Sequence, residues 1–427
     1  MKKNLAQWLS WQETLHLSEI DLGLDRIRKV AQKLNLLSPA FPIITVAGTN
    51  GKGSTVALFE SIFKAQGYIT GSYTSPHLID YNERIKLASV NASDDLIVEA
   101  FEAIDEARCD ISLTYFEFGT LASMFIFKQQ KVDVAILEVG LGGRLDASNL
   151  WDTSLAIITN IGIDHVDWLG DNREVIAIEK AGIMRKDIPA ICGDLNPPNN
   201  IANEAKRIGA KLYQINSTFF YEVNNQTTWT WTGFDKTYEL PFPNLSGDFQ
   251  VNNAATVIAG LKAIEKILPV KEIAIKQGLL NVSLIGRLQT IHNEPEWLID
   301  VAHNPHAAKQ LAKHIQNNPV VGKNIALFSM LNDKDIKKVI EIMNIQIDEW
   351  HLVELEGTRS TPLNELKVLI AQQNNSNDSN KIIKTHRSFF EAGKSLKSSS
   401  NLQDRVVAFG SFLVVSEVIK ICTLIYK

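Results

Sequence analysis

The fold is decided by one stretch, Phe41-Pro-Ile-Ile-Thr-Val-Ala-Gly48, which continues as Thr49-Asn-Gly-Lys-Gly-Ser-Thr55. The first part is a continuous apolar run that ends in glycine, which is typical of a buried parallel strand. Residues 55–66 then carry apolar side chains at helical spacing, and Gly67 closes that run. A strand, a glycine-rich turn and a helix in this order predict a phosphate-binding loop, because backbone amides at the helix start face the phosphates.

The side chains of this loop fit the same interpretation. Lys52 would place a positive charge on the β- and γ-phosphates, and the Ser54 hydroxyl would meet a magnesium ion or a phosphate oxygen. The loop departs from the G-x-x-x-x-G-K-[ST] pattern, because Gly53 separates the lysine from the hydroxyl residue and the loop is shorter at its start. On this segment alone, a glycine-rich turn without a ligand is the alternative.

The alternation of strand and helix recurs along the chain. Residues 120–128 have helical spacing, and residues 132–137 and 155–161 are apolar strands. This alternation predicts an α/β fold with an open, mostly parallel sheet. Polar and aromatic residues alternate over 212–240, which predicts antiparallel hairpins that decorate the sheet.

A second series of strands begins after Gly286 and Arg287, which we place in a loop. We expect strands, each followed by a helix, at residues 297–302, 324–330, 349–355 and 405–410. The chain is therefore expected to form a larger domain over residues 1–285 and a smaller α/β domain over residues 286–427.

Composition excludes several classes of function. The chain has 427 residues, of which 45% are hydrophobic and 21% charged, which is ordinary for a globular protein. A net charge of -5 leaves no global basic field for nucleic acid or an anionic membrane. The three cysteines are far apart and form no zinc or disulfide pattern. We find neither a signal peptide nor a membrane-length apolar window, and we expect a cytoplasmic protein.

Polar residues that follow the predicted strands are candidates for chemistry. Glu138 follows one strand, at the position from which an acidic residue holds magnesium. Asp164 and His165 end the next strand, and His165 is a candidate metal ligand because parallel strands end at one sheet edge. The alternative for these side chains is a solvated or hydrogen-bonded loop position. The spacing of Lys180 indicates only a solvated helix residue.

The second domain offers another polar strand end. Asp300, His303, Asn304 and His306 lie at the end of the strand predicted over residues 297–302. No cysteine or further acidic residue lies nearby, so a nucleotide or substrate contact is favoured over a metal. Arg287 could place its charge on phosphates bound by the first domain. An ordinary inter-domain salt bridge is the alternative for that arginine.

Taken in order, six blocks resemble the Mur ligase superfamily, and within it the folylpolyglutamate synthase/dihydrofolate synthase family. The blocks are residues 46–54, 74–78 with 82–85, 137–149, 164–170, 179–183 and 300–307. The resemblance implies an ATP-dependent ligase that joins a folate γ-carboxylate, or the carboxylate of dihydropteroate, to the α-amine of L-glutamate through an acyl phosphate. It also implies a P-loop ATP-binding domain, a Rossmann-like C-terminal glutamate-ligase domain and a monomer.

The same resemblance assigns site residues. The ATP-binding set is Gly51, Lys52, Gly53, Ser54, Asn253, Arg287 and Asp300. The ligands of two magnesium ions are Ser75, Glu138 and His165, and Lys180 corresponds to the lysine that the family carboxylates to support the second metal. A monovalent cation is a further expected ion, and the catalytic residues are Lys52, Lys180 and His165.

For the acceptor, bifunctional members of the family use a pteroate-binding set that matches Glu19, Ile20, Asp21, Leu22, Thr114, Leu145, Asp146 and Ala147. Glu19 replaces a smaller polar residue, which a backbone contact would tolerate. His303 and Ser411 are expected near the nucleotide or the glutamate. Because residues 110–117 resemble the bifunctional type, we expect both activities.

Four alternatives to the bifunctional ligase remain. They are a folylpolyglutamate synthase alone, a Mur-type ligase for another carboxylate such as a cell-wall precursor, a nucleotide-dependent binding or switch protein, and a phosphotransferase that stops at the acyl phosphate.

Overall fold

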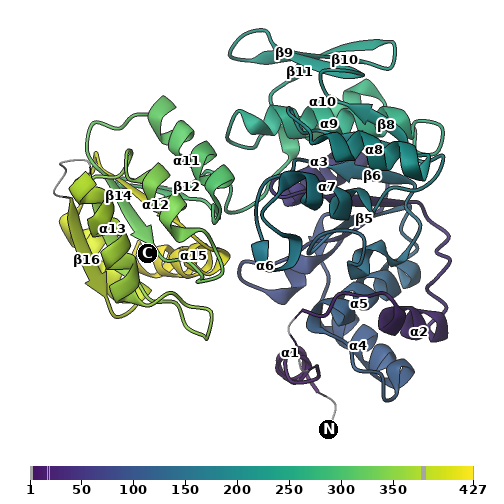
Figure 1. Ribbon diagram of the computed structural model, residues 1–427, viewed down its shortest axis with the longest axis horizontal. Coiled ribbons are helices and arrows are strands. Elements are labelled where there is room, and N and C mark those ends of the chain that lie inside the picture. The colour runs from purple at the N-terminus through teal and green to yellow at the C-terminus, as the bar shows by residue number, and fades with distance from the viewer. Residues whose placement is uncertain (1–2, 17, 19, 377–380, 427) are drawn as a thin grey trace. The chain divides into compact units, whose positions relative to one another are not determined.

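The computed structural model describes residues 3–16, 18, 20–376 and 381–426, without the side chains of 374–376. The chain divides into two compact units (Figure 1). Unit 1 comprises Met1–Asn244 and Gln250–Ser283, and unit 2 comprises Leu245–Phe249 and Leu284–Lys427. The predicted boundary lies between residues 285 and 286. Compared with it, residues 284–285 and the short segment 245–249 belong to the second unit instead of the first.

Unit 1 is built on an eight-stranded sheet in the order β4-β3-β2-β5-β1-β6-β7-β8. Its strands are β1 Ile43–Ala47, β2 Thr70–Tyr73, β3 Ile85–Leu87, β4 Val90–Asn91, β5 Val134–Glu138, β6 Leu155–Ile158, β7 Pro189–Cys192 and β8 Lys211–Gln214. The antiparallel pairings, β2 with β3 and β3 with β4, are confined to one edge, and the remaining pairs of this sheet are parallel. The predicted open, mostly parallel α/β sheet is therefore confirmed.

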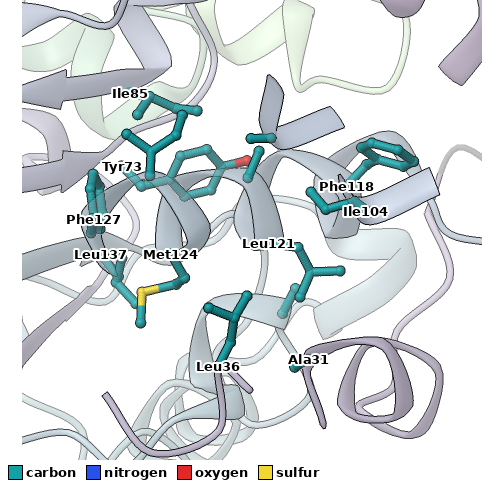
Figure 2. Packing of buried hydrophobic residues seen from close by; sticks show 14 of the residues in the cluster. Ala31, Leu36, Tyr73, Ile85, Ile104, Phe118, Leu121, Met124, Phe127 and Leu137 are labelled. Atoms are coloured by element: carbon teal, nitrogen blue, oxygen red, sulfur yellow. The ribbon is translucent and has the colours of Figure 1, made fainter. Parts of the chain in front are cut away.

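The strands β1, β2, β5 and β6 are buried at every residue. Since alternate residues of a strand point to opposite sides, both faces of the sheet are covered there. On one face, Leu155 and Ile157 approach Gly260 and Phe59, which places helices α3 and α9 there. On the other face, a cluster of aromatic and aliphatic side chains packs β2 and β5 against α2, α4 and α5 (Figure 2). The helices are α1 Leu5–Gln12, α2 Asp25–Lys33, α3 Lys52–Gln66, α4 Asp94–Arg108, α5 Tyr115–Gln129, α7 Arg173–Ala181, α8 Asn199–Ile208, α9 Phe249–Ala263 and α10 Glu272–Asn281.

Antiparallel hairpins form over the later part of the predicted range, as a separate sheet of β9 Phe219–Val223, β10 Thr228–Gly233 and β11 Lys236–Pro241. The start of the range was predicted wrongly, because residues 211–214 form β8, which pairs parallel with β7 at the edge of the main sheet. Trp229 and Trp231 of β10 are fully buried. The indole nitrogen of Trp231 donates to the carbonyl oxygen of Ala255 at 3.1 Å, so this sheet is fixed to α9.

Unit 2 contains a six-stranded sheet in the order β12-β13-β17-β14-β15-β16, in which only the edge strand β12 is antiparallel. Its strands are β12 Gln289–Asn293, β13 Glu296–Ile299, β14 Asn324–Phe328, β15 Glu349–Val353, β16 Ile382–His386 and β17 Arg405–Phe409. Its helices are α11 Pro305–Asn317, α12 Ile336–Met343, α13 Leu363–Ser376, α14 Phe389–Ser399 and α15 Phe412–Ile425. The predicted second α/β fold is confirmed. In the described part of the chain, no helix combines the length and apolar character needed to cross a bilayer.

Candidate active site

The loop between β1 and α3 depends on two glycines. Gly48 has φ 151°, and a Cβ there would collide with the Thr159 side chain. Gly51, at φ 81°, precedes the first residue of α3, and a Cβ there would lie 2.8 Å from Oδ1 of Asn253. No larger residue fits either position, which keeps the backbone amides of the loop close to the helix start.

The end of β6 holds this loop in one conformation. The Thr49 hydroxyl donates to the carbonyl oxygen of Gly162 at 3.0 Å and accepts from the Gly162 amide at 2.8 Å. The Asn160 side chain accepts from the Asn50 amide at 3.0 Å and donates to the Asn50 carbonyl oxygen at 2.9 Å. The loop is thus preorganised by its own chain, as a phosphate site requires.

A buried chain of hydrogen bonds connects the loop to α9. Nε2 of the Gln250 side chain donates to the Ser54 hydroxyl at 3.3 Å, and Nδ2 of the Asn253 side chain donates to Oε1 of Gln250 at 2.9 Å. The structure therefore brings Ser54 and Asn253, both expected at the nucleotide, to the same loop. The sequence reasoning missed Gln250, whose spacing of three residues from Asn253 puts both on one helix face.

Lys180 lies beside this loop rather than in solvent. Its side chain is buried, and Nζ donates to the Gly48 carbonyl oxygen at 2.9 Å. Burial, together with the charge of Lys52, lowers the pKa of Lys180 to about 7, while Asp164 and Asp146 oppose the shift. The solvated position indicated by the spacing alone is wrong, because the helix face that carries Lys180 packs against the loop.

The glycine-rich turn after β5 makes this burial possible. A Cβ on Gly143 would lie 2.7 Å from the carbonyl oxygen of Glu179, so the turn can touch the last residues of α7 only as glycine. The Arg144 amide donates to that same oxygen at 2.9 Å, and the Asn149 side chain donates to the Gly182 carbonyl oxygen at 3.1 Å. The turn and the helix end therefore form one packed unit around Lys180.

Two of the three expected metal ligands meet at one sheet edge. Ser75 follows β2 and Glu138 ends β5, the neighbouring parallel strand. The Ser75 amide donates to Oε2 of the buried Glu138 at 3.4 Å. His165 lies in the segment after β6, with φ 52° at the start of the short helix α6, Val166–Leu169.

The chemistry of these donors fits a small hard cation. Carboxylate and hydroxyl oxygens are the ligands that Mg²⁺ prefers, and such sites commonly include phosphate oxygens of the substrate. Within the described residues, no group of three or more His, Cys, Asp and Glu side chains is arranged to hold a metal by itself. A divalent cation here would therefore depend on Ser75, Glu138 and a bound nucleotide.

One of the expected acceptor residues, Thr114, lies at the N-terminus of α5. The Thr114 hydroxyl accepts from the Glu117 amide at 3.2 Å, and the Glu117 carboxylate accepts from the Thr114 amide at 2.8 Å. Asp146 is buried and accepts from the Leu141 and Ser148 amides, each at 2.9 Å. Burial raises the pKa of the Asp146 carboxyl, and these hydrogen bonds partly offset the shift.

A second network, missed by the sequence reasoning, fixes the segment that precedes α2. The Arg26 guanidinium donates to the Asp21 carbonyl oxygen at 2.8 Å and to Oε1 of Glu117 at 3.3 Å. Nε2 of His16 lies 3.1 Å from the Asp21 carboxylate, which also pairs with Arg26.

These contacts join the segment to the start of α5. The remaining expected acceptor residues that the structure describes are Ile20, Leu22 and Leu145, which are partly buried, and Ala147, which is buried. The expected contact at Glu19 lies outside the described residues.

In unit 2 the remaining expected residues gather at the ends of β13 and β17. The buried Asp300 accepts from the Leu288 and Ala302 amides, each at 2.8 Å. Burial raises the pKa of its carboxyl, and Arg287 lowers it in part.

The ring of Phe412 connects this group, because it lies 5.3 Å from the Arg287 guanidinium and 6.1 Å from the His303 ring. Ser411 caps α15 by accepting from the Val414 amide at 3.1 Å.

Known proteins resemble the chain over nearly its whole length. Residues 46–261 match the Mur ligase middle domain, and residues 286–412 match the Mur ligase glutamate ligase domain. A dihydrofolate synthase/folylpolyglutamate synthase of Escherichia coli is 41% identical over 98% of this chain and 95% of its own length.

Two solved structures resemble the whole chain. The Escherichia coli FolC structure in complex with DHPP and ADP covers 100% of this chain and 99% of its own, at 40% identity and a TM-score of 0.93. A bifunctional folylpolyglutamate synthase/dihydrofolate synthase with Mn, AMPPNP and L-glutamate bound covers 98% of both chains, at 40% identity and a TM-score of 0.89.

Proposed function

The chain belongs to the Mur ligase family, within the group of dihydrofolate synthases/folylpolyglutamate synthases, and on that premise we propose that it ligates L-glutamate to 7,8-dihydropteroate and to tetrahydrofolates with ATP. The observation that carries the proposal is the convergence of Lys52 and the buried Lys180 on the loop carbonyl of Gly48. This arrangement places two lysine amines at one phosphate site.

Ligation needs an activated carboxylate, because a carboxylate is a poor electrophile at neutral pH. An oxygen of the acceptor carboxylate attacks the γ-phosphorus of ATP, the bond to the β–γ bridging oxygen breaks, and ADP leaves. The amine of L-glutamate then attacks the acyl carbon, loses a proton and displaces phosphate through a tetrahedral intermediate. Lys52 and the amides at the start of α3 bind the phosphates throughout, since their positive charge is fixed in place.

Ser75, Glu138 and His165 are proposed to hold magnesium at the sheet edge, in line with the Mn-containing relative. When bound, the cation neutralises charge on the phosphate oxygens. Glu138 contributes a buried carboxylate whose position is fixed by the Ser75 amide. We also propose that a second magnesium ion and a monovalent cation bind.

We further propose that Lys180 is carboxylated. The neutral amine attacks the carbon of CO₂, forms an N–C bond and releases one proton, which leaves an anionic carbamate. Only the unprotonated amine can do this, and a pKa of about 7 makes that form abundant at neutral pH. The product would carry oxygens suited to the second cation.

Acceptor specificity is proposed to lie at the start of α5. Thr114 and the segment from Ile20 to Leu22 are joined by the contacts around Glu117 and Arg26. Asp146, held by the Leu141 and Ser148 amides, is proposed to belong to the same acceptor site. In unit 2, the group of Asp300, Arg287, His303 and Ser411 is proposed to contact ATP or L-glutamate.

We assign residues 1–285 to ATP and acceptor binding and residues 286–427 to glutamate ligation, which the matched domain models support. We also propose that the protein acts as a monomer in the cytoplasm, where free cysteines such as Cys109 fit a reducing compartment.

Product identification tests the proposed function. The purified protein is incubated with ATP, Mg²⁺ and L-glutamate, together with either dihydropteroate or tetrahydrofolate, and the products are identified by mass spectrometry. The proposal predicts dihydrofolate from the first acceptor and a polyglutamylated folate from the second. A product from tetrahydrofolate alone would reduce the function to folylpolyglutamate synthesis, and no glutamylated product would overturn it.

A further inference from the structure

The guanidinium of Arg84 lies in unit 1 without a carboxylate to neutralise it. Arg84 ends the one-turn helix η1, Tyr81–Arg84, and is partly buried. Its carbon Cζ lies 5.5 Å from the ring centroid of Tyr81 and 5.3 Å from that of Tyr115. Across the part of the chain that the structure describes, no Asp or Glu side chain forms an ion pair with it. A guanidinium stays charged in proteins, so this is an unneutralised cation.

The carboxylates closest in sequence are engaged elsewhere. Glu83 accepts three backbone amides of the preceding turn, at 2.8, 2.9 and 2.9 Å, and Asp80 closes a capping box with Glu83. Arg84 itself is oriented by a hydrogen bond from Nε to Nδ1 of His77, at 2.8 Å. This bond occupies Nε, and the Tyr73 hydroxyl is a further hydrogen-bonding partner of the guanidinium. The rings of Tyr81 and Tyr115, whose centroids are 5.7 Å apart, lie beside the guanidinium together. The remaining terminal N–H groups belong to the part of the fork that pairs with a carboxylate.

Arg84 is connected to the proposed metal site on one side. The Thr74 amide donates to the Arg84 carbonyl oxygen at 2.9 Å, and the next residue is Ser75. On the other side it is connected to the proposed acceptor site, because Tyr115, which stacks on the guanidinium, directly follows Thr114.

The electrostatic balance of this region points the same way. Glu138 and Asp146 alone would repel an incoming carboxylate. The positive charge of Arg84 would offset that repulsion.

We propose that Arg84 binds the carboxylate of the acceptor, the group that receives the γ-phosphate, and so sets its position for attack. This inference rests on the proposed function and deepens it. Dihydropteroate and folates share a terminal carboxylate, so one arginine serves both acceptors. Its planar fork would hold both oxygens of the carboxylate, which fixes the direction of the attacking atom.

The test compares an acceptor that has the carboxylate with one that lacks its charge. Binding of dihydropteroate and of its carboxamide is measured by calorimetry in the presence of Mg²⁺ and a non-hydrolysable ATP analogue. Wild type should bind the carboxylate about 10- to 100-fold more tightly, as expected for a charge-assisted pair. Arg84→Gln should bind both compounds with equal, weak affinity, and Arg84→Lys should retain part of the preference.

Arg108 supplies the matched control, since its guanidinium also stacks on a ring, that of Trp11 at 5.2 Å, but pairs with Asp105. Arg108→Gln should keep the full preference for the carboxylate. In turnover, Arg84→Gln should raise KM for both acceptors and leave KM for ATP unchanged, which a loss of fold would not do.

The outcomes separate the two claims. If wild type prefers the carboxylate and Arg84→Gln keeps the same preference, the role of Arg84 is wrong while the proposed function stands. If wild type binds neither compound, the proposed function fails and the inference falls with it. Should Arg84→Gln not fold, an undiminished preference in Arg84→Lys together with an unchanged KM for both acceptors would contradict the inference.

Discussion

Lys52 and Lys180 donate to the same carbonyl oxygen, that of Gly48, at 3.1 and 2.9 Å. One lysine comes from the phosphate loop and the other from the end of α7, 128 positions later in the chain. Their mutual repulsion adds to burial in lowering the pKa of Lys180 from its ordinary 10.5 to about 7. The nucleotide loop therefore contributes, after burial, to the lowered pKa of the residue that we propose to be carboxylated.

Activity should depend on carbon dioxide in a pH-dependent way. Above about pH 7 the Lys180 amine is mostly neutral and can form the carbamate, and below it the ammonium form cannot. Protein stripped of CO₂ should regain activity on addition of bicarbonate, and more completely at about pH 8 than at about pH 6. Initial rates with and without bicarbonate measure this. If added bicarbonate leaves the rate unchanged at both pH values, carboxylation is contradicted.

Replacing Lys180 should separate activity from folding. The folded-state pKa lies below the unfolded one, so the unfolded chain binds more protons between about pH 7 and 10.5, and stability rises with pH across that window. The buried amine therefore weakens the fold most below pH 7. Lys180→Ala should lower kcat by about 100-fold or more with the fold intact. Lys180→Met should lower kcat to the same extent without lowering the melting temperature at pH 6. Normal turnover in either variant would refute the catalytic role of Lys180.

Glu138 and Glu60 form a matched pair of buried glutamates. Glu138 ends a strand at the proposed metal site, whereas Glu60 lies within α3, where burial raises its pKa. Glu138→Gln should raise the Mn²⁺ concentration for half-saturation by at least about 10-fold, because it removes an anionic ligand. Glu60→Gln should leave it unchanged. Electron paramagnetic resonance of free Mn²⁺ measures both, and equal affinities would contradict the metal assignment.

Thr114 carries both a structural and a binding expectation. As N-cap of α5, its replacement in Thr114→Ala should cost about 1 kcal/mol of stability. The same cost is expected for Ser93→Ala at the start of α4, which accepts from the Leu96 amide at 3.3 Å. Only Thr114→Ala should raise KM for dihydropteroate. Thermal melts measure the loss of stability in both variants, and acceptor titrations measure KM for dihydropteroate. If Thr114→Ala and Ser93→Ala have the same KM, Thr114 does not belong to the acceptor site.

The sequence predicted those features that local patterns encode. The glycine loop, the helix closed by Gly67 and the buried strands β1, β5 and β6 were found because apolar runs and glycine positions directly reflect backbone constraints. The buried strand β2, Thr70–Tyr73, was missed because it is short and half polar. Both edge strands of unit 2, β12 and β16, were missed. Their polar residues, such as Gln289 and Lys384, dilute the apolar signal, since an edge strand is only partly buried.

Contacts between distant segments could not be predicted from spacing. Lys180 has no local feature that distinguishes it from a solvated lysine, and its burial follows from a glycine turn that begins at Gly140, far earlier in the chain. Likewise, Arg26 meets Glu117 across 91 positions. The family resemblance supplied the expectation for Lys180, and the fold supplies its physical reason.

The central claim is that both acceptors are activated and ligated at one site. The most direct measurement is ADP release by the purified protein with Mg²⁺, ATP and L-glutamate, compared among dihydropteroate, tetrahydrofolate and no acceptor. The account predicts ADP release with each acceptor, well above the acceptor-free rate and dependent on L-glutamate. ADP release that is the same in all three arms would contradict it.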